Sequence, residues 1–503
     1  MRVLSFALEG IDAVPVVVEV DVSHGLPSFD IVGLPDAAVR ESRERVRAAV
    51  QNSGWAFPAQ RITVNLAPAH TRKGGAGFDL AVALGILAAL GHLQSSALAG
   101  VAVAGELALD GTLRAVRGAL AMGLATMRER ATGLILPQAS AREAALAGCA
   151  VYPAFHLCEA VQHLSGAAPL APVIPLAAAA ESPHSPVDLA DVRGQLVGKR
   201  ALEIAAAGGH NLFFVGPPGA GKSLLARCLP GIMPPLDQEE SLEVSRIHSV
   251  AGALSGGTLI SCRPYRAPHH CASRAAVLGG GTPLRPGEIT LAHQGVLFLD
   301  ELPEFGRNVL EGLRQPLEEG KVHISRANGS VVFPARPMLV AAANPCPCGY
   351  LGSAVRPCTC PPSAVAMYRG RMSGPILDRF DLHLHLEPVP YDCVATTSPP
   401  AEPSAAVRSR VIQARARQRA RLRETGLTCN AQMAVRETRR FAPLPAAGEA
   451  MMRQAVDRMG LSLRAHDRIL KVARTIADLA GAEAIEVPHL AEALQYRAVD
   501  RAV

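Results

Sequence analysis

The stretch NLFFVGPPGAGKSLLARCL, residues 211–229, decides the fold of this chain of 503 residues. An apolar run predicts a buried strand, a glycine-rich loop follows it, and the start of a helix comes next. Backbone N–H groups of such a loop surround nucleotide phosphates, the lysine neutralises the β- and γ-phosphates, and the last hydroxyl binds Mg²⁺. The complete match to G-x-x-x-x-G-K-[ST] predicts ATP binding by Gly216, Pro217, Pro218, Gly219, Ala220, Gly221, Lys222 and Ser223.

The second half of a nucleotide site is GVLFLDELPEF, residues 295–305. Its apolar core predicts a buried parallel strand, with Asp300 and Glu301 at the carboxyl end. We expect Asp300 to hold the Mg²⁺ through water, and Glu301 to orient and deprotonate the attacking water. Such a pair can also be a solvated strand end, but its position after the phosphate loop favours an ATP hydrolase.

A third apolar run, PMLVAAANP at residues 337–345, places Asn344 just past the end of another predicted strand. This position is similar to one that carries a polar residue in ring ATPases of the AAA+ class. There the residue contacts the γ-phosphate and the attacking water, and Asn344 fits that role.

Four cysteines crowd the segment directly after Asn344 and form two C-x-C pairs, Cys346/Cys348 and Cys358/Cys360. Four thiolates brought together by tight turns suit a structural Zn²⁺. Simple core cysteines are the alternative, although the polar, proline-rich surroundings argue against them. Disulfides are disfavoured in a reducing compartment. We take a zinc site within the loop 346–360 as a hypothesis.

Two boundary stretches, one rich in alanine and proline and one rich in proline and serine, divide the chain into three domains and two linkers. The net charge of +6 and the pI near 8.8 permit contact with nucleic acid without requiring it. No signal peptide is recognisable, and the apolar run 80–93 is too short to span a bilayer, so we expect a cytoplasmic protein with no membrane partner. The segments are an α/β domain at 1–165, an Ala/Pro linker at 166–186, an α/β core at 187–390, a second linker at 391–406 and a helical bundle at 407–503.

Four segments together carry a resemblance to a known family: RAPHHCASRAAVLGGG (266–281), PGEITLAHQGVLFLDELPEF (286–305), AANPCPCG (342–349) and GPILDRFDLHL (374–384). They resemble the ComM/YifB family, bacterial AAA+ ATPases related to the magnesium-chelatase motor subunit. The resemblance implies a multidomain α/β fold with a P-loop core, a presensor hairpin insert and a C-terminal helical lid.

The same resemblance implies a function. Family members implicated in natural transformation are hexameric motors that migrate branched DNA during recombination. We therefore expect an ATP-hydrolysing helicase or translocase, assembled as a homo-hexamer, with branched or single-stranded DNA and recombination proteins as partners. The alternative is a protein-remodelling or magnesium-chelatase-like ATPase that does not act on DNA.

Carried over residue by residue, the resemblance makes Arg379 the arginine finger and Arg464 the sensor-2 arginine. Each is otherwise a surface arginine in an arginine-rich protein. The family pattern has an acidic residue where this chain has Ser273-Arg274, so we assign His269 and His270 no role.

Two basic elements leave alternatives open. EEGKVHISRANGSVVFPARPMLV (318–340) predicts a hairpin, in which Arg326 is either a DNA-backbone contact or an ordinary solvated residue. The helix predicted at 407–424 spaces its arginines to reach phosphates, but it equally suits a face of the lid bundle or a subunit contact.

The N-terminal segment resembles the proteolytic domain of Lon over residues 71–87 and 103–122. A protease of this type needs a serine nucleophile and a lysine base. Here the serine position falls on Gly75 or Ala76, and the lysine position falls at about Leu120. We therefore expect an inactive Lon-protease-like domain with no peptidase activity.

Overall fold

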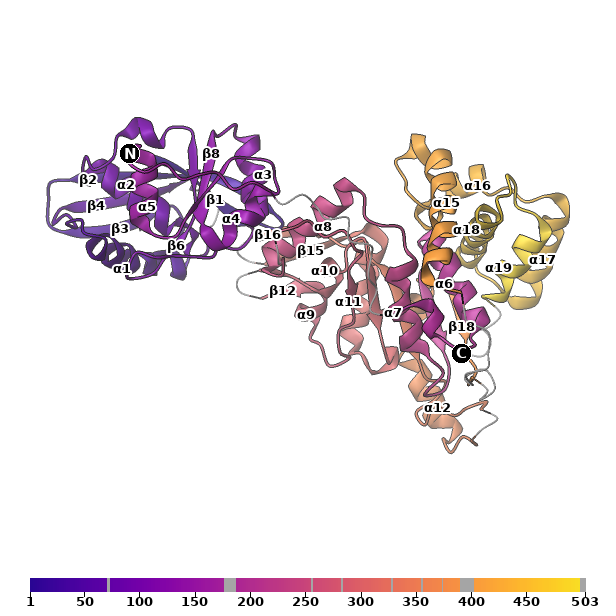
Figure 1. Cartoon of the computed structure of the whole chain (residues 1–503). Coiled ribbons are helices and arrows are strands. Elements are labelled where there is room, and N and C mark those ends of the chain that lie inside the picture. The colour runs from indigo at the N-terminus through magenta and orange to yellow at the C-terminus, as the bar shows by residue number, and fades with distance from the viewer. Residues whose placement is uncertain are drawn as a thin grey trace.

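The computed structural model describes residues 1–69, 73–175, 187–254, 257–281, 284–326, 329–353, 356–372, 374–389 and 402–497. Figure 1 shows three parts in a row, an N-terminal α/β domain on the left, a central α/β domain and a C-terminal helical bundle on the right.

The N-terminal domain is built on a seven-stranded sheet of order β3-β4-β2-β1-β5-β8-β9. Its β2 pairs antiparallel with β1 and β4, whereas β1, β5, β8 and β9 run parallel. The apolar run noted above forms the helix α2, which is buried from Asp79 to Ala88. The strands are β1 (Arg2–Glu9), β2 (Asp12–Ser23), β3 (Ser28–Val32), β4 (Arg61–Ala67), β5 (Val101–Val103), β8 (Gly133–Pro137) and β9 (Val151–Ala154). The helices are α1 (Ala37–Asn52), α2 (Asp79–Ala89), α3 (Ala119–Arg128), α4 (Gln138–Ala145) and α5 (Leu157–Ser165).

The central domain has a five-stranded sheet of order β11-β14-β17-β10-β18, in which every neighbouring pair is parallel. The strands β10, β14 and β17 are buried throughout, as expected for a sheet covered on both faces. Because all strands point the same way, their carboxyl ends meet at one edge. The strands are β10 (Leu212–Val215), β11 (Tyr265–Arg266), β14 (Val296–Leu299), β17 (Met338–Ala343) and β18 (Leu382–His385).

Helices and a hairpin surround this sheet. The predicted hairpin is present as β15 (Lys321–Arg326) and β16 (Gly329–Pro334), although the residues at its tip lie outside the described ones. The helices are α6 (Leu196–Gly208), α7 (Lys222–Ile232), α8 (Gln238–Ala251), α9 (Arg274–Leu278), α10 (Glu288–Leu291), α11 (Arg307–Glu319), α12 (Pro362–Gly370) and α13 (Gly374–Leu377).

The C-terminal part is helical, as predicted. It comprises α15 (Ser404–Leu422), α16 (Val435–Phe441), α17 (Ala446–Met459), α18 (Leu463–Ala480) and α19 (Val487–Gln495). The first helix begins at Ser404 rather than 407, because Ser404 is anchored to the start of the central domain. Its N–H donates to Asp188 Oδ1 at 3.0 Å, and its hydroxyl accepts from the Leu189 N–H at 2.8 Å. Residues 391–401 of the predicted linker, together with residue 390 before it, lie outside the described residues.

One apolar core joins this bundle to the central domain. Val411 of α15 and Ile469 of α18 belong to the same buried cluster as Ala205 of α6 and Leu225 of α7. The bundle therefore packs beside the helix that follows the phosphate loop.

The N-terminal domain contacts the central domain through α8 and the hairpin. Arg246 of α8 pairs with Asp12 at 3.1 Å, and the Gly118 N–H donates to the Ser249 carbonyl at 3.1 Å. Ile11, in the turn between β1 and β2, is 7% exposed and joins the apolar cluster of the central domain, against which Val331 of the hairpin packs. One side of the hairpin is thus covered by the N-terminal domain.

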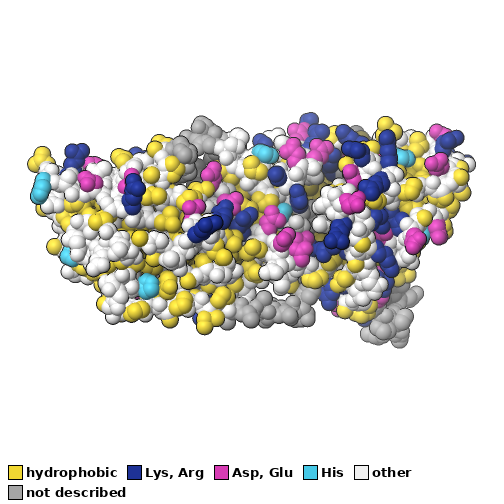
Figure 2. Space-filling model, turned by 90° about the horizontal axis from the view of Figure 1, so that it is seen from above, with side chains coloured by type: hydrophobic (Ala, Val, Ile, Leu, Met, Phe, Trp, Pro, Cys, Tyr) yellow, Lys and Arg dark blue, Asp and Glu magenta, His cyan; other side chains and the backbone are white. Residues whose placement is uncertain are grey.

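Among the described helices, none is both long and apolar enough to cross a membrane. On the face shown in Figure 2, basic side chains are interspersed with acidic ones, mainly in the right half, while the left half is mostly hydrophobic and uncharged.

Candidate nucleotide site

The phosphate loop lies between β10 and α7, at the carboxyl edge of the parallel sheet. Gly221 is the N-cap of α7, with a left-handed φ of 85°, so the chain turns sharply and Lys222 begins the helix. The free N–H groups of the first helical turn then face the loop, which is the arrangement that binds phosphate.

Lys222 lies under this loop and is only 9% exposed. Its ammonium donates to the carbonyls of Gly216 at 2.6 Å and Pro217 at 2.9 Å, and to Asn344 Oδ1 at 3.1 Å. Burial lowers the pKa of Lys222, while the negative charges of Asp300 and Glu301 counteract that effect. A buried ammonium surrounded by acceptor oxygens fits phosphate oxygens as its partners.

The predicted Mg²⁺ residues meet across the sheet. Ser223 Oγ donates to Asp300 Oδ2 at 2.7 Å, although the two residues are 77 positions apart. A hydroxyl and a carboxylate side by side form a hard oxygen donor set of the kind that Mg²⁺ prefers. The residues present therefore fit the ATP–Mg²⁺ complex expected from the sequence.

Glu301 follows Asp300 in a strained backbone conformation, with a φ of 54° that non-glycine residues rarely adopt. Its side chain is 52% exposed, and its Oε2 lies 3.2 Å from Nδ1 of His270. The His270 ring packs against that of His269 in a tilted arrangement, with centroids 4.1 Å apart and an interplanar angle of 34°. Strain at a residue predicted to be the catalytic base is consistent with a functional site.

His270 is a contact that our sequence reasoning missed. It follows β11, the strand beside β14, so the parallel register carries it to the carboxyl edge where Glu301 lies. The signal available in the sequence was the histidine pair after a short strand, which we left without a role.

Asn344 follows β17 directly, and β17 lies between β10 and β14. The position between the two strands places Asn344 beside Lys222, as the hydrogen bond above shows. The structure therefore brings together the phosphate-loop lysine, Ser223, Asp300 and Asn344 at one edge, with Glu301 adjacent in sequence.

Gln195 is a second residue that the sequence reasoning missed. It has a left-handed φ of 51° at the start of α6. Its side-chain amide donates to the carbonyl of Ala220 at 2.9 Å and to that of Glu387 at 2.7 Å. It thus ties the phosphate loop to the segment after β18. A glutamine before a helix gives no recognisable signal by itself.

Arg379 lies outside this cluster in the single chain. Its guanidinium forms an ion pair with Glu318 of α11, its side chain is 12% exposed, and its carbonyl accepts from Asn211 Nδ2 at 2.9 Å. Within the described residues, no hydrogen bond or ion pair joins it to the phosphate loop. Its role as an arginine finger for a neighbouring subunit stays a prediction.

Arg464 is exposed in the first turn of α18 and makes no hydrogen bond or ion pair with any residue that the structure describes. The arginine one turn later has the tertiary contacts: Arg468 donates to the Phe380 carbonyl at 3.1 Å and lies 3.5 Å from Asp381. This link between the bundle and the start of β18 was not predicted from the sequence.

The other basic candidates are Arg326 of the hairpin and the arginines of α15. The side chain of Arg326 lies outside the described residues, so its DNA contact stays a prediction. In α15, by contrast, Arg408 donates to the Gly231 carbonyl, Arg415 to the Ala206 carbonyl, and Arg419 pairs with Asp237. These contacts hold α15 against α6, α7 and the start of α8 of the central domain, so these three arginines already have partners within the chain.

In the N-terminal domain, the positions that would need a serine and a lysine hold neither. Gly75 and Ala76 lie at the turn before α2, and Leu120 is completely buried in α3.

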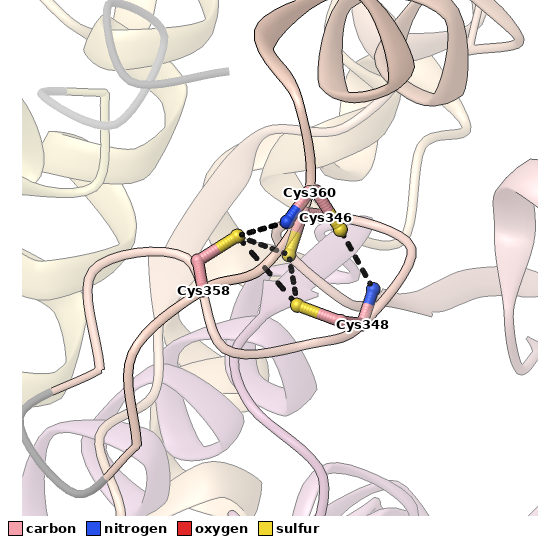
Figure 3. Close-up of side chains that lie close together, drawn as sticks. All are labelled: Cys346, Cys348, Cys358 and Cys360. Atoms are coloured by element: carbon pink, nitrogen blue, oxygen red, sulfur yellow. Dashed lines mark hydrogen bonds between the residues drawn. The ribbon is translucent and has the colours of Figure 1, made fainter.

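The four cysteines converge, as Figure 3 shows. Cys346 Sγ lies 3.4 Å from Cys348 Sγ and 3.7 Å from Cys358 Sγ, and the latter two are 3.6 Å apart. All four sulfur atoms lie within 4.8 Å of one another. A second group of metal-ligand type, His269, His270 and Cys271, is more exposed.

Comparison with known proteins follows the three parts of the fold. The profile described as "Subunit ChlI of Mg-chelatase" matches residues 18–140, "Magnesium chelatase, subunit ChlI" matches 188–394, and "Magnesium chelatase, subunit ChlI C-terminal" matches 401–497.

Full-length relatives are similar over nearly the whole chain. "Uncharacterized protein YifB" of Salmonella typhimurium is 44% identical over 493 residues, which cover 98% of this chain and 96% of the relative. "Competence protein ComM" of Haemophilus influenzae is 45% identical over 504 residues, covering 99% and 97%. "Uncharacterized protein Rv2897c" of Mycobacterium tuberculosis is 42% identical over 499 residues, covering 99% and 98%. The chain therefore belongs to the ComM/YifB family of magnesium-chelatase-like AAA+ ATPases.

Proposed function

We propose that this protein hydrolyses ATP to drive a ring motor on branched or single-stranded DNA, in recombination during natural transformation. The observation that carries the ATPase part is the hydrogen bond between Ser223 and Asp300, with Glu301 next in the chain. The DNA part is supported by the 45% identity to a relative named for competence.

Each residue of the nucleotide site has its own role in this proposal. Lys222 binds phosphate oxygens, Ser223 and Asp300 hold the cation, and Mg²⁺ when bound neutralises charge that develops on the transferred phosphoryl group. Glu301, exposed and held by His270, accepts the proton of the attacking water. Asn344 orients that water from the side of Lys222.

We further propose a homo-hexamer in which Arg379 reaches the nucleotide of the neighbouring subunit. The ion pair with Glu318 supports this assignment, because it holds the guanidinium beside a half-exposed carboxylate of α11 rather than in the chain's own nucleotide site. The guanidinium would exchange Glu318 for phosphate oxygens when subunits assemble.

The remaining assignments complete the proposal. The hairpin β15–β16 is the presensor insert, Arg326 near its tip contacts the DNA backbone, and Arg464 is the sensor-2 arginine of the lid. The N-terminal domain is Lon-protease-like and has no peptidase activity. The protein works in the cytoplasm together with recombination proteins.

The decisive experiment measures ATP turnover by the purified chain without DNA and with single strands, duplex and a four-way junction. Glu301→Gln serves as the blank. We expect stimulation by junction or single-stranded DNA, followed by strand displacement in a second assay. Turnover that is the same in all four conditions would instead favour a protein-remodelling or chelatase-like ATPase, with the N-terminal domain as the bait for partners.

A further inference from the structure

The sulfur atoms of the four-cysteine cluster, Cys346, Cys348, Cys358 and Cys360, are spaced as ligands of one metal ion. Zinc–sulfur bonds of about 2.3 Å in a tetrahedron place the sulfur atoms about 3.8 Å apart. The three measured separations, 3.4, 3.6 and 3.7 Å, are close to that edge. A disulfide would need about 2.05 Å. These separations match a shared metal ion better than any pairing of the thiols.

Backbone groups also hold the cluster in place. The Cys348 N–H donates to Cys360 Sγ at 3.4 Å, and the Cys360 N–H donates to Cys358 Sγ at 3.4 Å (Figure 3). Cys346 is completely buried. Soft sulfur ligands in this number select Zn²⁺ over the hard cations that suit Ser223 and Asp300. The donor set of the cluster is therefore chemically different from that of the nucleotide site.

The cluster adjoins the phosphate loop. The turn that carries its first two cysteines is closed by a hydrogen bond from the Gly349 N–H to the Cys346 carbonyl at 2.9 Å. A Cβ on Gly349 would lie 2.6 Å from Cδ of Pro218 and 3.8 Å from Cγ of Asn344. The turn is thus packed directly against the phosphate loop and against the residue that accepts from Lys222.

The helix α12 follows the second cysteine pair directly and contacts the segment that holds the first pair. α12 begins at Pro362, directly after Cys360 and Pro361, and its Arg369 donates to the Pro345 carbonyl at 3.3 Å. Tyr368 of the same helix is 6% exposed, and burial raises its pKa to about 12. A metal bound by both cysteine pairs would therefore clamp the start of α12 to the turn beneath Pro218.

We propose that Cys346, Cys348, Cys358 and Cys360 bind one structural Zn²⁺, and that this metal holds the turn 346–349 against the phosphate loop. Nucleotide affinity then depends on metal occupancy. The coupling is mechanical, because Gly349 touches Pro218 and the cluster begins two residues after Asn344. It does not depend on the proposed action on DNA.

The first test is the metal content of the purified full-length chain, measured by elemental mass spectrometry. We expect about one zinc per chain. We expect Cys358→Ser to lose most of it, and the Co²⁺-substituted chain to show thiolate-to-cobalt charge-transfer absorption. Zinc well below one equivalent, with no such absorption after reconstitution with Co²⁺, would overturn the metal site.

The second test compares the affinity of zinc-loaded and chelator-stripped chain for a fluorescent ATP analogue, with circular dichroism to verify that both are folded. We expect stripping to weaken binding by about tenfold and zinc to restore it. Equal affinities in two folded samples would overturn the coupling. Neither measurement involves DNA, so failure here is distinguishable from failure of the proposed function.

A matched pair of variants tests the contact between the turn 346–349 and the phosphate loop. Gly349 and Gly352 lie in the same loop with φ of 83° and 77°, so an alanine strains the backbone equally at both. Only at Gly349 would the new Cβ meet Pro218, because at Gly352 no described residue beyond its chain neighbours lies within 4 Å. We expect Gly349→Ala to weaken nucleotide binding with zinc retained, and Gly352→Ala to leave it unchanged. Equal effects of the two would contradict the proposal.

Discussion

Ser223 Oγ donates a hydrogen bond of 2.7 Å to Asp300 Oδ2, which joins the first turn of α7 to the end of β14. The strand β17 lies between β10 and β14, and it contributes Asn344 beside Lys222. Two hydrogen bonds thus connect three strand ends at one edge of the sheet. Each residue in these contacts has a distinct expected effect on nucleotide binding or hydrolysis.

Replacing Lys222 with alanine should abolish tight nucleotide binding. The ammonium is buried among acceptors, and charge-assisted hydrogen bonds of up to about 3 kcal/mol correspond to a loss of about a hundredfold in affinity. Titration with a fluorescent ATP analogue measures the affinity of the variant. Lys321→Ala, at the exposed start of β15, is the control that should bind normally. Near-normal affinity of the Lys222 variant would contradict the site.

Replacing Glu301 with glutamine should leave ATP binding intact and slow hydrolysis by about 10² to 10⁴, the usual contribution of a general base. The amide keeps the shape of the side chain but cannot accept the proton. Single-turnover kinetics with radiolabelled ATP separate the two steps. A variant that still hydrolyses at the normal rate would remove Glu301 from the mechanism.

Replacing His270 with alanine should lower turnover by about tenfold, since small misplacements of a reacting group cost up to about a hundredfold. Nucleotide affinity should not change, because His270 contacts Glu301 rather than the phosphate loop. His269→Ala is the matched control, since that ring packs against His270 and the ion pair to Glu301 is made by His270. Equal turnover in both variants would show that the contact is incidental.

Replacing Arg379 with alanine should abolish hydrolysis while ATP affinity stays close to normal, because the finger acts on the neighbouring subunit. Mixing this variant with Lys222→Ala should restore part of the turnover. At some mixed interfaces, an intact phosphate loop then meets an intact Arg379. Arg371→Ala, which loses only an exposed pair with Glu304, is the control. A mixture as inactive as its components would argue against a shared site.

Asp381 should make the protein sensitive to acid. Burial by itself raises its pKa, but the hydrogen bond from His210 and the charges of His210, Arg468 and Lys471 outweigh burial and hold the pKa well below 3.8. The stabilisation is therefore fully present above pH 3.8, the ordinary value, and it is lost as the pH falls from there through the lower folded pKa.

Asp381→Asn should accordingly lower the free energy of unfolding at pH 7 by about 3 kcal/mol, as for a broken buried ion pair. The difference from the parent chain should shrink below about pH 4, because the unfolded parent then takes up a proton at Asp381 that the folded parent does not. Urea unfolding of both chains at about pH 7 and about pH 2 measures this difference in the free energy of unfolding. A difference that does not depend on pH would mean that the carboxylate charge is unimportant.

Local sequence pattern predicted much of the fold. The strand–loop–helix order around Lys222, the apolar runs before Asp300 and Asn344, the hairpin at 318–340 and the helical bundle all depend on residues close together in sequence. Apolar periodicity and glycine or proline punctuation determine such elements because they act through the backbone of a few neighbouring residues. The two cysteine pairs were visible for the same reason.

Tertiary structure alone decided which of these residues touch. Strand order placed His270 beside Glu301, a left-handed turn placed Gln195 beside Ala220, and helix packing placed Arg468 beside Asp381. The contact of Gly349 with Pro218 joins segments more than a hundred residues apart. Contacts of that kind depend on the register and packing of distant elements, which no short stretch of sequence encodes by itself. The sequence by itself determined the elements and the chemistry that they carry, and the packing of the sheet edge determined how that chemistry is assembled.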